Sequence, residues 1–488
     1  GERVYVCARF DDEVLAVDPV AGTVAARAAV VREPVAAVIA KGGTRLLVAN
    51  HLPAGPADGE YTSAAISVID TVACEQIATL ALPNGSTGLR GLCLSPDGRY
   101  AYATHILGRY QLPTTQLERG WMNTNALTVI DVEKNALVNT VLLDSVDLGA
   151  ANPWGVDCTP DGAWLCVAHA GTNEISIIDR PALHAKLDKV AAGEAVSEVS
   201  QEPDDVPNDL SFLVDLRRRI NLEGHGPRAL ACVGATAYAG EYFSDSIGLV
   251  DVTGGEYTKA ETFALGPEPT MTQVRQGEIF FNSAELCFQH WQSCASCHPD
   301  ARADALNWDL LNDGLGNPKN TKSMLLSHAT PPAMISGVRD KAETAVRAGI
   351  RHIQFAVRPD EDAEAIDAYR ESLTPAPSPL LEKGAMSEAA QRGAKVFKSA
   401  GCITCHLGEY HTDLGQYDVG TGRGREKNME FDTPTLVEVW RTAPYLHDGR
   451  AATIEDVLTT CNPDDEHGTT SSLSAEEIAD LAEYVRSL

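Results

Sequence analysis

The feature that most restricts the fold of this chain is a short unit that recurs five times in its N-terminal half. Each copy joins two runs of alternating small and β-branched residues, and the second run ends in aspartate. Alternation with a period of two is typical of β-strands. The paired runs cover residues 4–7 with 14–18, 46–50 with 66–70, 100–103 with 127–131, 165–168 with 175–179, and 237–240 with 247–251.

Tight turns precede several of these runs, for example Ser95-Pro96-Asp97-Gly98. Proline presets one backbone dihedral there, and glycine supplies a positive one. Strand units that repeat every ~40–70 residues indicate propeller blades. The sequence therefore predicts a β-propeller over residues 1–268, interrupted by a charged helical insertion at 181–225. This region resembles the YVTN-type β-propellers of bacterial surface and periplasmic proteins.

One repeating position at the end of the first run is polar: Arg9, Asn50, His105, His169 and Glu241. Two interpretations remain open. Such a ring could hold a metal or line an entrance, or the strand ends could simply face water. The long loops 51–64 and 106–125 leave from the same end, and we expect this face of the propeller to pack toward the rest of the chain.

Two Cys-x-x-Cys-His motifs lie in the C-terminal half, at residues 294–298 and 402–406. Two thiols at this spacing can form thioethers to one porphyrin, while the following imidazole reaches the iron. A zinc site would need a second Cys/His pair close by, and neither motif has one. The sequence therefore predicts two covalent haem c groups, attached through Cys294, Cys297, Cys402 and Cys405, with His298 and His406 as iron ligands.

Covalent haem is installed outside the bacterial cytoplasm, so we expect an exported protein, periplasmic or at the cell surface. We expect its export signal to lie outside this sequence. No apolar run approaches the ~18 residues of a membrane span. The 39 basic and 68 acidic residues give a net charge of -29. That charge disfavours nucleic acid and suits a basic redox partner protein, although it could merely keep the protein soluble.

From Met271 onward the pattern becomes helical. Amphipathic segments at 273–281 and 388–397 precede the two motifs, and segments at 365–373 and 478–488 follow them. The last segment begins with a capping box formed by Ser474 and Glu477. The sequence therefore predicts two tandem α-helical cytochrome c domains, 269–374 and 387–488, with a proline-rich linker at 375–386.

Four stretches carry a further resemblance: residues 293–298, 319–321, 432–436 and 443–453. On these, residues 271–488 resemble the bacterial di-haem cytochrome c peroxidase and MauG superfamily. The resemblance implies peroxide chemistry at the first haem and electron relay at the second. It also implies a calcium ion between the domains, for which Asn320 and Thr433 are the candidate ligands.

The distal side of the first haem departs from this family. No His occurs between His298 and His328, so the usual distal ligand is absent and we expect an open iron. The family's distal Glu aligns with Gln354, which cannot accept a proton. His352, with Arg351 beside it, is the candidate replacement, and His328 is another; a purely structural His352 is the alternative. The family's bridging Trp falls on Ser336, which leaves Trp308 and Trp440 as substitutes.

The second haem departs as well. The family's sixth ligand, Met in the peroxidases and Tyr in MauG, falls on Cys461, and no Met follows Met429. Cys461 and His467 are the candidate ligands, and a buried or disulfide-bonded Cys461 is the alternative. Either ligand predicts a lower potential than a His/Met haem has.

These features predict a di-haem oxidoreductase, peroxidase-like or MauG-like, that activates hydrogen peroxide or oxidises a substrate at the first haem. The alternative is an electron-transfer protein without peroxidase turnover, in which the propeller is a docking module. Hydrazine synthase subunits also combine a propeller with a di-haem module, so small-nitrogen chemistry is a third possibility.

Overall fold

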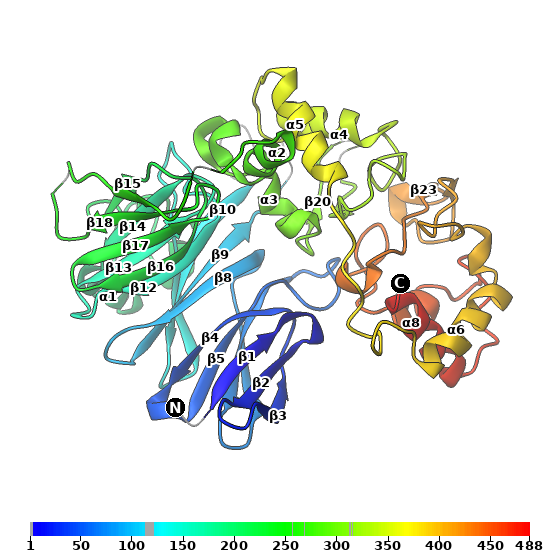
Figure 1. Ribbon diagram of the computed structural model, residues 1–488, viewed down its shortest axis with the longest axis horizontal. Coiled ribbons are helices and arrows are strands. Elements are labelled where there is room, and N and C mark those ends of the chain that lie inside the picture. Colours follow the sequence, from blue (N-terminus) through cyan, green and yellow to red (C-terminus); the bar gives the residue numbers. More distant parts are fainter. Residues whose placement is uncertain (1–2, 113–121, 256, 268, 312–313, 315) are drawn as a thin grey trace. The chain divides into compact units, whose positions relative to one another are not determined.

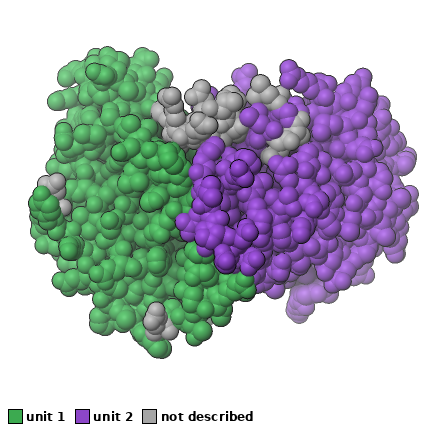
Figure 2. All heavy atoms as spheres, turned by 90° about the horizontal axis from the view of Figure 1, so that it is seen from above, with its two compact units in different colours: residues 1–53, 63–109, 117–296 green, residues 54–62, 110–116, 297–488 purple. Residues whose placement is uncertain are grey.

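The computed structural model describes residues 3–112, 122–255, 257–267, 269–311, 314 and 316–488 (Figure 1). Its contacts divide the chain into two compact units (Figure 2). The first unit contains residues 1–53, 63–109 and 117–296, and the second contains 54–62, 110–116 and 297–488. Among the described helices, none combines the length and the apolar character needed to span a membrane.

The first unit contains five antiparallel sheets whose strands follow one another in chain order. The first sheet is β1 (Val4–Ala8), β2 (Glu13–Asp18) and β3 (Thr23–Ala29). The second is β4 (Pro34–Ala40), β5 (Arg45–Asn50), β6 (Ala65–Asp70) and β7 (Glu75–Ala81). The third is β8 (Ser86–Leu94), β9 (Tyr100–Gly108), β10 (Asn123–Asp131) and β11 (Ala136–Leu142).

The fourth sheet is β12 (Pro153–Cys158), β13 (Trp164–His169), β14 (Glu174–Asp179) and β15 (Arg217–Asn221). The fifth is β16 (Pro227–Val233), β17 (Thr236–Glu241), β18 (Ser246–Asp251) and β19 (Glu261–Ala264). Helix α1 (Arg180–Ala191) and a 3-10 turn (Pro203–Asn208) lie between β14 and β15. Each of the five predicted pairs of runs forms two neighbouring antiparallel strands.

Successive sheets pack on one another through apolar side chains. The first strands touch in chain order, from β1 to β4, β8, β12 and β16. A separate cluster of buried apolar residues lies at each junction between neighbouring sheets. Burial of apolar surface at these junctions is the main stabilising contribution. This arrangement is consistent with the propeller part of the prediction, and the described strands form no closed barrel.

Four of the five residues at the polar repeat position form neither a metal ring nor water-facing strand ends, and the fifth, Arg9, is half-buried and pairs with Glu33. Asn50, His105, His169 and Glu241 are all buried. Each bonds to a hydroxyl group on the next strand of its own sheet, and the four hydroxyls belong to Ser67, Thr128, Ser176 and Ser246. In the described part of the chain, no group of three or more His, Cys, Asp or Glu side chains could hold a metal ion. The repeat is therefore an internal hydrogen bond that ties neighbouring strands together.

The prediction of two tandem α-helical cytochrome c domains is wrong. Sheets dominate the structure, and the helices from residue 269 onward are short and separated by long irregular segments. They are α2 (Gln273–Asn282), α3 (Cys294–Cys297), α4 (Ala342–His352), α5 (Asp360–Glu371), α6 (Glu388–Ser399), α7 (Ile454–Leu458) and α8 (Ala475–Arg486). Two short sheets pair β20 (Asn307–Trp308) with β21 (Lys319–Asn320) and β22 (Gln416–Tyr417) with β23 (Phe431–Asp432). Helical periodicity located individual amphipathic segments, but it says nothing about the glycine- and proline-rich stretches between them.

Helices α6 and α8 form the core of the region around the second motif. Phe397 packs there with apolar residues of α8, and a Cβ atom at Gly393 would lie only 1.9 Å from the carbonyl oxygen of Asp480. Only glycine permits this close approach. The predicted capping box of Ser474 and Glu477 starts α8. This packing fixes the end of α6, from which the second motif continues.

Candidate functional site

The first Cys-x-x-Cys-His motif begins in a single helical turn, α3, and two serines hold that turn in place. The Asn152 side chain donates to Ser293 Oγ at 2.8 Å and accepts from Ser296 Oγ at 2.7 Å. Both serines are buried. Cys294 and Cys297, half-buried, are therefore presented by a turn whose backbone is tied to the loop that precedes β12.

His298 has the tautomer that metal binding requires. Its Nδ1 lies 3.0 Å from the carbonyl oxygen of Arg302, so Nδ1 carries the proton and donates it. Burial lowers the pKa of His298, which keeps the ring neutral. In the neutral ring Nε2 then carries the lone pair, and a backbone acceptor on the opposite nitrogen is the usual support of a ligating imidazole.

The second motif repeats this arrangement. Cys402 lies in a 3-10 turn (Cys402–Thr404), and burial raises the pKa of both Cys402 and Cys405. His406 Nδ1 donates to the carbonyl oxygen of His411 at 3.1 Å, and burial lowers the pKa of His406. Both motifs thus present two thiols and one neutral imidazole with Nε2 available.

A second imidazole faces His406. The ring centroids of His406 and His467 are 6.3 Å apart, with 47° between the ring planes. Imidazole nitrogens bind metals at about 2 Å, so two rings on opposite sides of one metal have centroids about 6 Å apart. Burial, and then the nearby His406, lower the pKa of His467 to about 4. Two neutral imidazoles at this separation could hold one haem iron between them.

The loop that carries His467 is held by Asn462, a buried residue that the sequence did not single out. The Asn462 side-chain oxygen accepts from the backbone N–H of His467 at 2.8 Å. Its amide donates to Gly468 O at 2.9 Å and to Thr470 Oγ1 at 2.8 Å. The backbone N–H of Thr469 also donates to Ala400 O, at the end of α6. The loop is thereby fixed beside the second motif.

Cys461, the other candidate, lies at the start of this loop. Its thiol is half-buried and free, 3.9 Å from the Thr460 hydroxyl, and its backbone N–H donates to Asp456 O. The structure therefore places the His467 ring opposite the His406 ring. Cys461 precedes Asn462 in the chain, whereas His467 follows it.

The candidate distal residues of the first haem differ in solvent exposure. Arg351 and His352 are the last two residues of α4 and are exposed, as is His328. Gln354 is buried, and its backbone N–H donates to Gly349 O at 3.0 Å. Of the four, only Gln354 is enclosed by protein.

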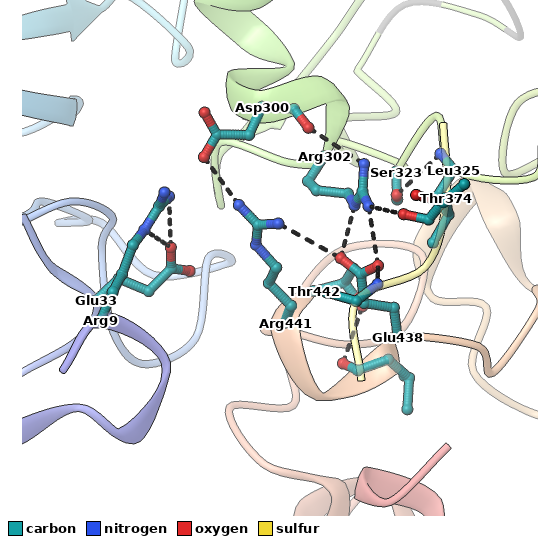
Figure 3. A network of polar contacts seen from close by, with 12 residues as sticks. Arg9, Glu33, Asp300, Arg302, Ser323, Leu325, Thr374, Glu438, Arg441 and Thr442 are labelled. Atoms are coloured by element: carbon teal, nitrogen blue, oxygen red, sulfur yellow. Dashed lines mark hydrogen bonds and ion pairs between the residues drawn. The ribbon is translucent and has the colours of Figure 1, made fainter. Parts of the chain in front are cut away.

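A buried ion-pair network supports the segment after His298 (Figure 3). Arg302 Nε lies 2.7 Å from Glu438 Oε1, and Arg302 Nη2 lies 2.9 Å from Glu438 Oε2. Glu438 is 1% exposed. Arg441 extends the network from Glu438 to the Asp300 carboxylate at 2.8 Å. No sequence pattern indicated this network, because Arg302 and Glu438 lie 136 positions apart and belong to no motif.

The network bears directly on the iron ligand. The same Arg302 whose guanidinium is clamped by Glu438 presents the carbonyl that orients His298. In Figure 3, Arg302 and Arg441 approach the Glu438 carboxylate from two sides. The segment around Glu438 thus supports the residue whose carbonyl orients His298.

One candidate substitute for the bridging tryptophan has an acceptor for its N–H. Trp308 is buried and donates from Nε1 to Asp304 Oδ2 at 2.9 Å. Burial raises the pKa of Asp304 to about 7. The indole N–H of Trp308 is therefore satisfied by a buried acidic side chain.

The two candidate calcium ligands lie in ordered backbone. The Asn320 side-chain amide donates to Pro444 O at 2.5 Å, and its buried side-chain oxygen is without a hydrogen-bond partner. The Thr433 carbonyl accepts from the Thr412 hydroxyl at 2.7 Å. An unpartnered amide oxygen is a ligand type that calcium prefers.

Part of the first long loop belongs to the second unit. Ala57 N–H donates to Gly449 O at 2.8 Å, and Asn307 Nδ2 donates to Ala57 O at 3.0 Å. Residues 54–62 are thus held by the segment that follows His447. Residues 113–121 of the other long loop lie outside the described residues.

No protein-family model matches the chain. It is 32% identical to the hydrazine synthase subunit gamma of Kuenenia stuttgartiensis, in a match that covers 44% of this chain and 77% of that subunit. The chain belongs to the family of hydrazine synthase subunit gamma. A solved structure of Kuenenia stuttgartiensis hydrazine synthase aligns at 30% identity and a TM-score of 0.42, over 45% of this chain and 89% of that chain.

Two further relatives have names that match the sequence prediction. The cytochrome c551 peroxidase of Nitrosomonas europaea is 28% identical over 31% of this chain and 51% of its own length. The methylamine utilization protein MauG of Methylophilus methylotrophus is 25% identical over 39% of this chain and 72% of its own length. These relatives are haem-dependent oxidoreductases, and the protein is an enzyme of that general kind, as predicted.

Proposed function

We propose that the protein is an exported di-haem c-type oxidoreductase in which the haem held by His298 reacts and the haem held by His406 relays electrons. The observation that carries this proposal is the facing pair of His406 and His467, 6.3 Å apart. A haem enclosed by two imidazoles has no free position for a substrate, so it suits electron transfer. When bound, the two haems supply the one-electron redox chemistry.

The first motif suits the reactive role because its distal side differs. The candidate residues for the distal side of the first haem are exposed, apart from Gln354, whereas His467 lies opposite His406. The Arg302 carbonyl holds the proton on Nδ1 of His298, which keeps Nε2 available as the single protein ligand.

The remaining candidate roles follow from the contacts of each residue. His352 and Arg351 can exchange protons with, and orient, a substrate that enters from solvent. Trp308, with its N–H on Asp304, serves electron passage between the two haems. Asn320 contributes its unpartnered oxygen to a calcium ion, together with backbone oxygen at Thr433. The acidic surface suits a basic redox partner protein.

Hydrogen peroxide is the first candidate substrate, because the relatives include a cytochrome c551 peroxidase and MauG. Gln354 argues for a second candidate, since a side chain that cannot accept a proton removes the usual route for activating peroxide. The relationship to hydrazine synthase subunits favours small nitrogen compounds as that second candidate.

The experiment is a rapid-mixing comparison on the holoprotein. Oxidised and half-reduced samples are mixed separately with hydrogen peroxide and with hydrazine, and the absorbance of both haems is followed. Rapid change confined to the high-spin haem, followed by electron transfer from the low-spin haem, supports the proposal for that reagent. If neither reagent alters the high-spin haem while the low-spin haem still exchanges electrons with a partner, the protein is an electron carrier and the proposal fails.

A further inference from the structure

Four cysteines of the first unit, none of them in a haem motif, lie at two neighbouring sheet junctions. Cys93 on β8 and Cys158 on β12 belong to the buried cluster between the third and fourth sheets. Cys166 on β13 and Cys232 on β16 belong to the cluster between the fourth and fifth sheets. Each junction therefore contains one cysteine from each of the two sheets that meet there.

The strand registers show that the two pairs are repeats of one arrangement. Cys158 lies opposite Leu165 in the fourth sheet, and Cys232 lies opposite Ala237 at the equivalent place in the fifth. Successive side chains of a strand point to opposite faces, and paired residues share a face. Cys158 and Cys232 therefore face the preceding sheet.

The partner cysteines face the other way. Cys166 lies opposite Asp157 and therefore shares its face of the sheet. Asp157 directly precedes Cys158 on β12, so Asp157 and Cys166 point away from the face of Cys158, toward the following sheet. Cys93 lies opposite Tyr102, the residue that corresponds to Cys166 in the third sheet. At both junctions, a thiol that points toward the following sheet thus meets a thiol that points toward the preceding sheet.

The four thiols are unbonded in the structure, and the two thiols of each pair lie close enough to interact. The pKa of Cys93 is raised first by its interaction with the Cys158 thiol and then by burial. The pKa of Cys166 is raised in the same order, by the Cys232 thiol and then by burial. The Cys232 strand is also anchored to the fourth sheet, because its backbone N–H donates to Asp157 Oδ2 at 2.8 Å.

A single metal site built from all four sulfurs is not the explanation. Among the described residues, no set of three or more His, Cys, Asp or Glu side chains has an arrangement that could hold a metal ion. The four thiols are therefore two pairs rather than one tetrahedral set.

The other non-haem cysteines provide internal controls. Cys287 packs with Trp291 and Leu107, and its sulfur lies 3.5 Å from the carbonyl oxygen of Phe288. Cys461 has the Thr460 hydroxyl as its neighbour. Cys7 and Cys74 share a core cluster, but the pKa of each is raised by burial and not by the other thiol.

We propose that Cys93–Cys158 and Cys166–Cys232 are disulfide bonds that link the third sheet to the fourth and the fourth to the fifth. In each bond two S–H groups are lost and one S–S bond forms, while the disulfide of an oxidised thiol oxidoreductase in the exporting compartment is reduced to a dithiol. Exchange takes place during folding, because a thiol with a raised pKa in a closed core is unreactive.

The two proposed bonds lie on strands next to the residues that hold the first haem motif. Strand β12 ends at Cys158 and begins next to Asn152, the residue that holds Ser293 and Ser296. With a bond at each of its two junctions, the fourth sheet is tied to both neighbours. The covalent links therefore restrict movement of the strand that carries the Asn152 contact.

The first test is disulfide mapping of the exported holoprotein. The protein is denatured and alkylated without reductant, digested, and analysed by mass spectrometry. The proposal predicts one linked peptide pair for Cys93–Cys158, another for Cys166–Cys232, and alkylated Cys7, Cys74, Cys287 and Cys461. Full alkylation of either proposed pair, or its linkage to a different cysteine, overturns the proposal for that pair.

The second test uses reductant-dependent stability, which a mere packing role would not alter. Dithiothreitol should lower the Tm of the wild-type holoprotein by about 5 °C or more for the two bonds together. The double variants Cys93→Ala/Cys158→Ala and Cys166→Ala/Cys232→Ala should each lose part of this shift, and the quadruple variant all of it. Cys287→Ala is the matched control and should keep the full shift. A wild-type Tm that does not respond to reductant contradicts the proposal.

Discussion

The two haem motifs are alike on one side and different on the other. His298 and His406 each donate from Nδ1 to a backbone carbonyl a few residues further along the chain. His406 faces a second imidazole, that of His467. The residues proposed to act near His298 are mostly exposed instead.

We infer from this difference that each motif supplies the proximal ligand, whereas segments far along the chain determine the distal side. The proximal tautomer follows from a local turn within each motif. The distal side of the second site depends on the loop that Asn462 holds, far along the chain from His406. Reactivity and relay are therefore separable by substitutions outside the motifs.

The largest effect is expected from removing one attachment site at a time. Cys294→Ala/Cys297→Ala should leave one haem, low-spin, and Cys402→Ala/Cys405→Ala should leave one haem, high-spin. Intact mass and a pyridine haemochrome assay give the number of haems, and absorbance spectra give the spin state. Two haems in either variant, or the same spin state in both variants, would contradict the difference between the two haem sites.

The next largest effect concerns the network behind His298. Glu438→Ala leaves the buried Arg302 guanidinium without its partner and should cost about 3–5 kcal/mol of unfolding free energy. Glu13→Ala removes the exposed pair with Arg27 and should cost no more than about 1 kcal/mol. Urea unfolding of the two variants measures the difference. Equal losses would show that the buried network does not stabilise this segment.

A smaller effect is expected from the residue that positions the distal loop of the second site. Asn462→Ala removes one acceptor and several donors and should cost about 1–3 kcal/mol, with part of the second haem becoming high-spin. Asp464→Ala, an exposed change in the same loop, is the control and should leave the spectrum unaltered. An unaltered low-spin signal in Asn462→Ala, at normal stability, would deny Asn462 a positioning role.

Several features were predictable because their signals are local. Alternating strand runs, the capping box of Ser474 and the haem motifs each depend on residues within a few positions of one another. The prediction of tandem helical domains was wrong, because the same local signals do not describe the irregular segments between the helices from residue 269 onward. The sequence left Cys461 and His467 as alternative ligands of the second haem. The His467 ring lies opposite the His406 ring because of the path of the loop that Asn462 holds, which no local pattern reveals.

The Arg302–Glu438 network could not be found from the sequence at all. Its two members lie in different parts of the chain, and either one alone reads as a surface charge. The thiol pairs at the sheet junctions were equally hidden, since register between sheets is a property of the folded chain.

Electron paramagnetic resonance of the oxidised holoprotein tests most directly whether His467 is the second protein ligand of the haem on His406. The account predicts one high-spin ferric signal from the haem on His298 and one low-spin signal from the haem on His406. In His467→Ala the low-spin signal should become high-spin, and in Cys461→Ser it should not change. A low-spin signal that survives in His467→Ala and is lost in Cys461→Ser would contradict the account, because Cys461 would then be the ligand.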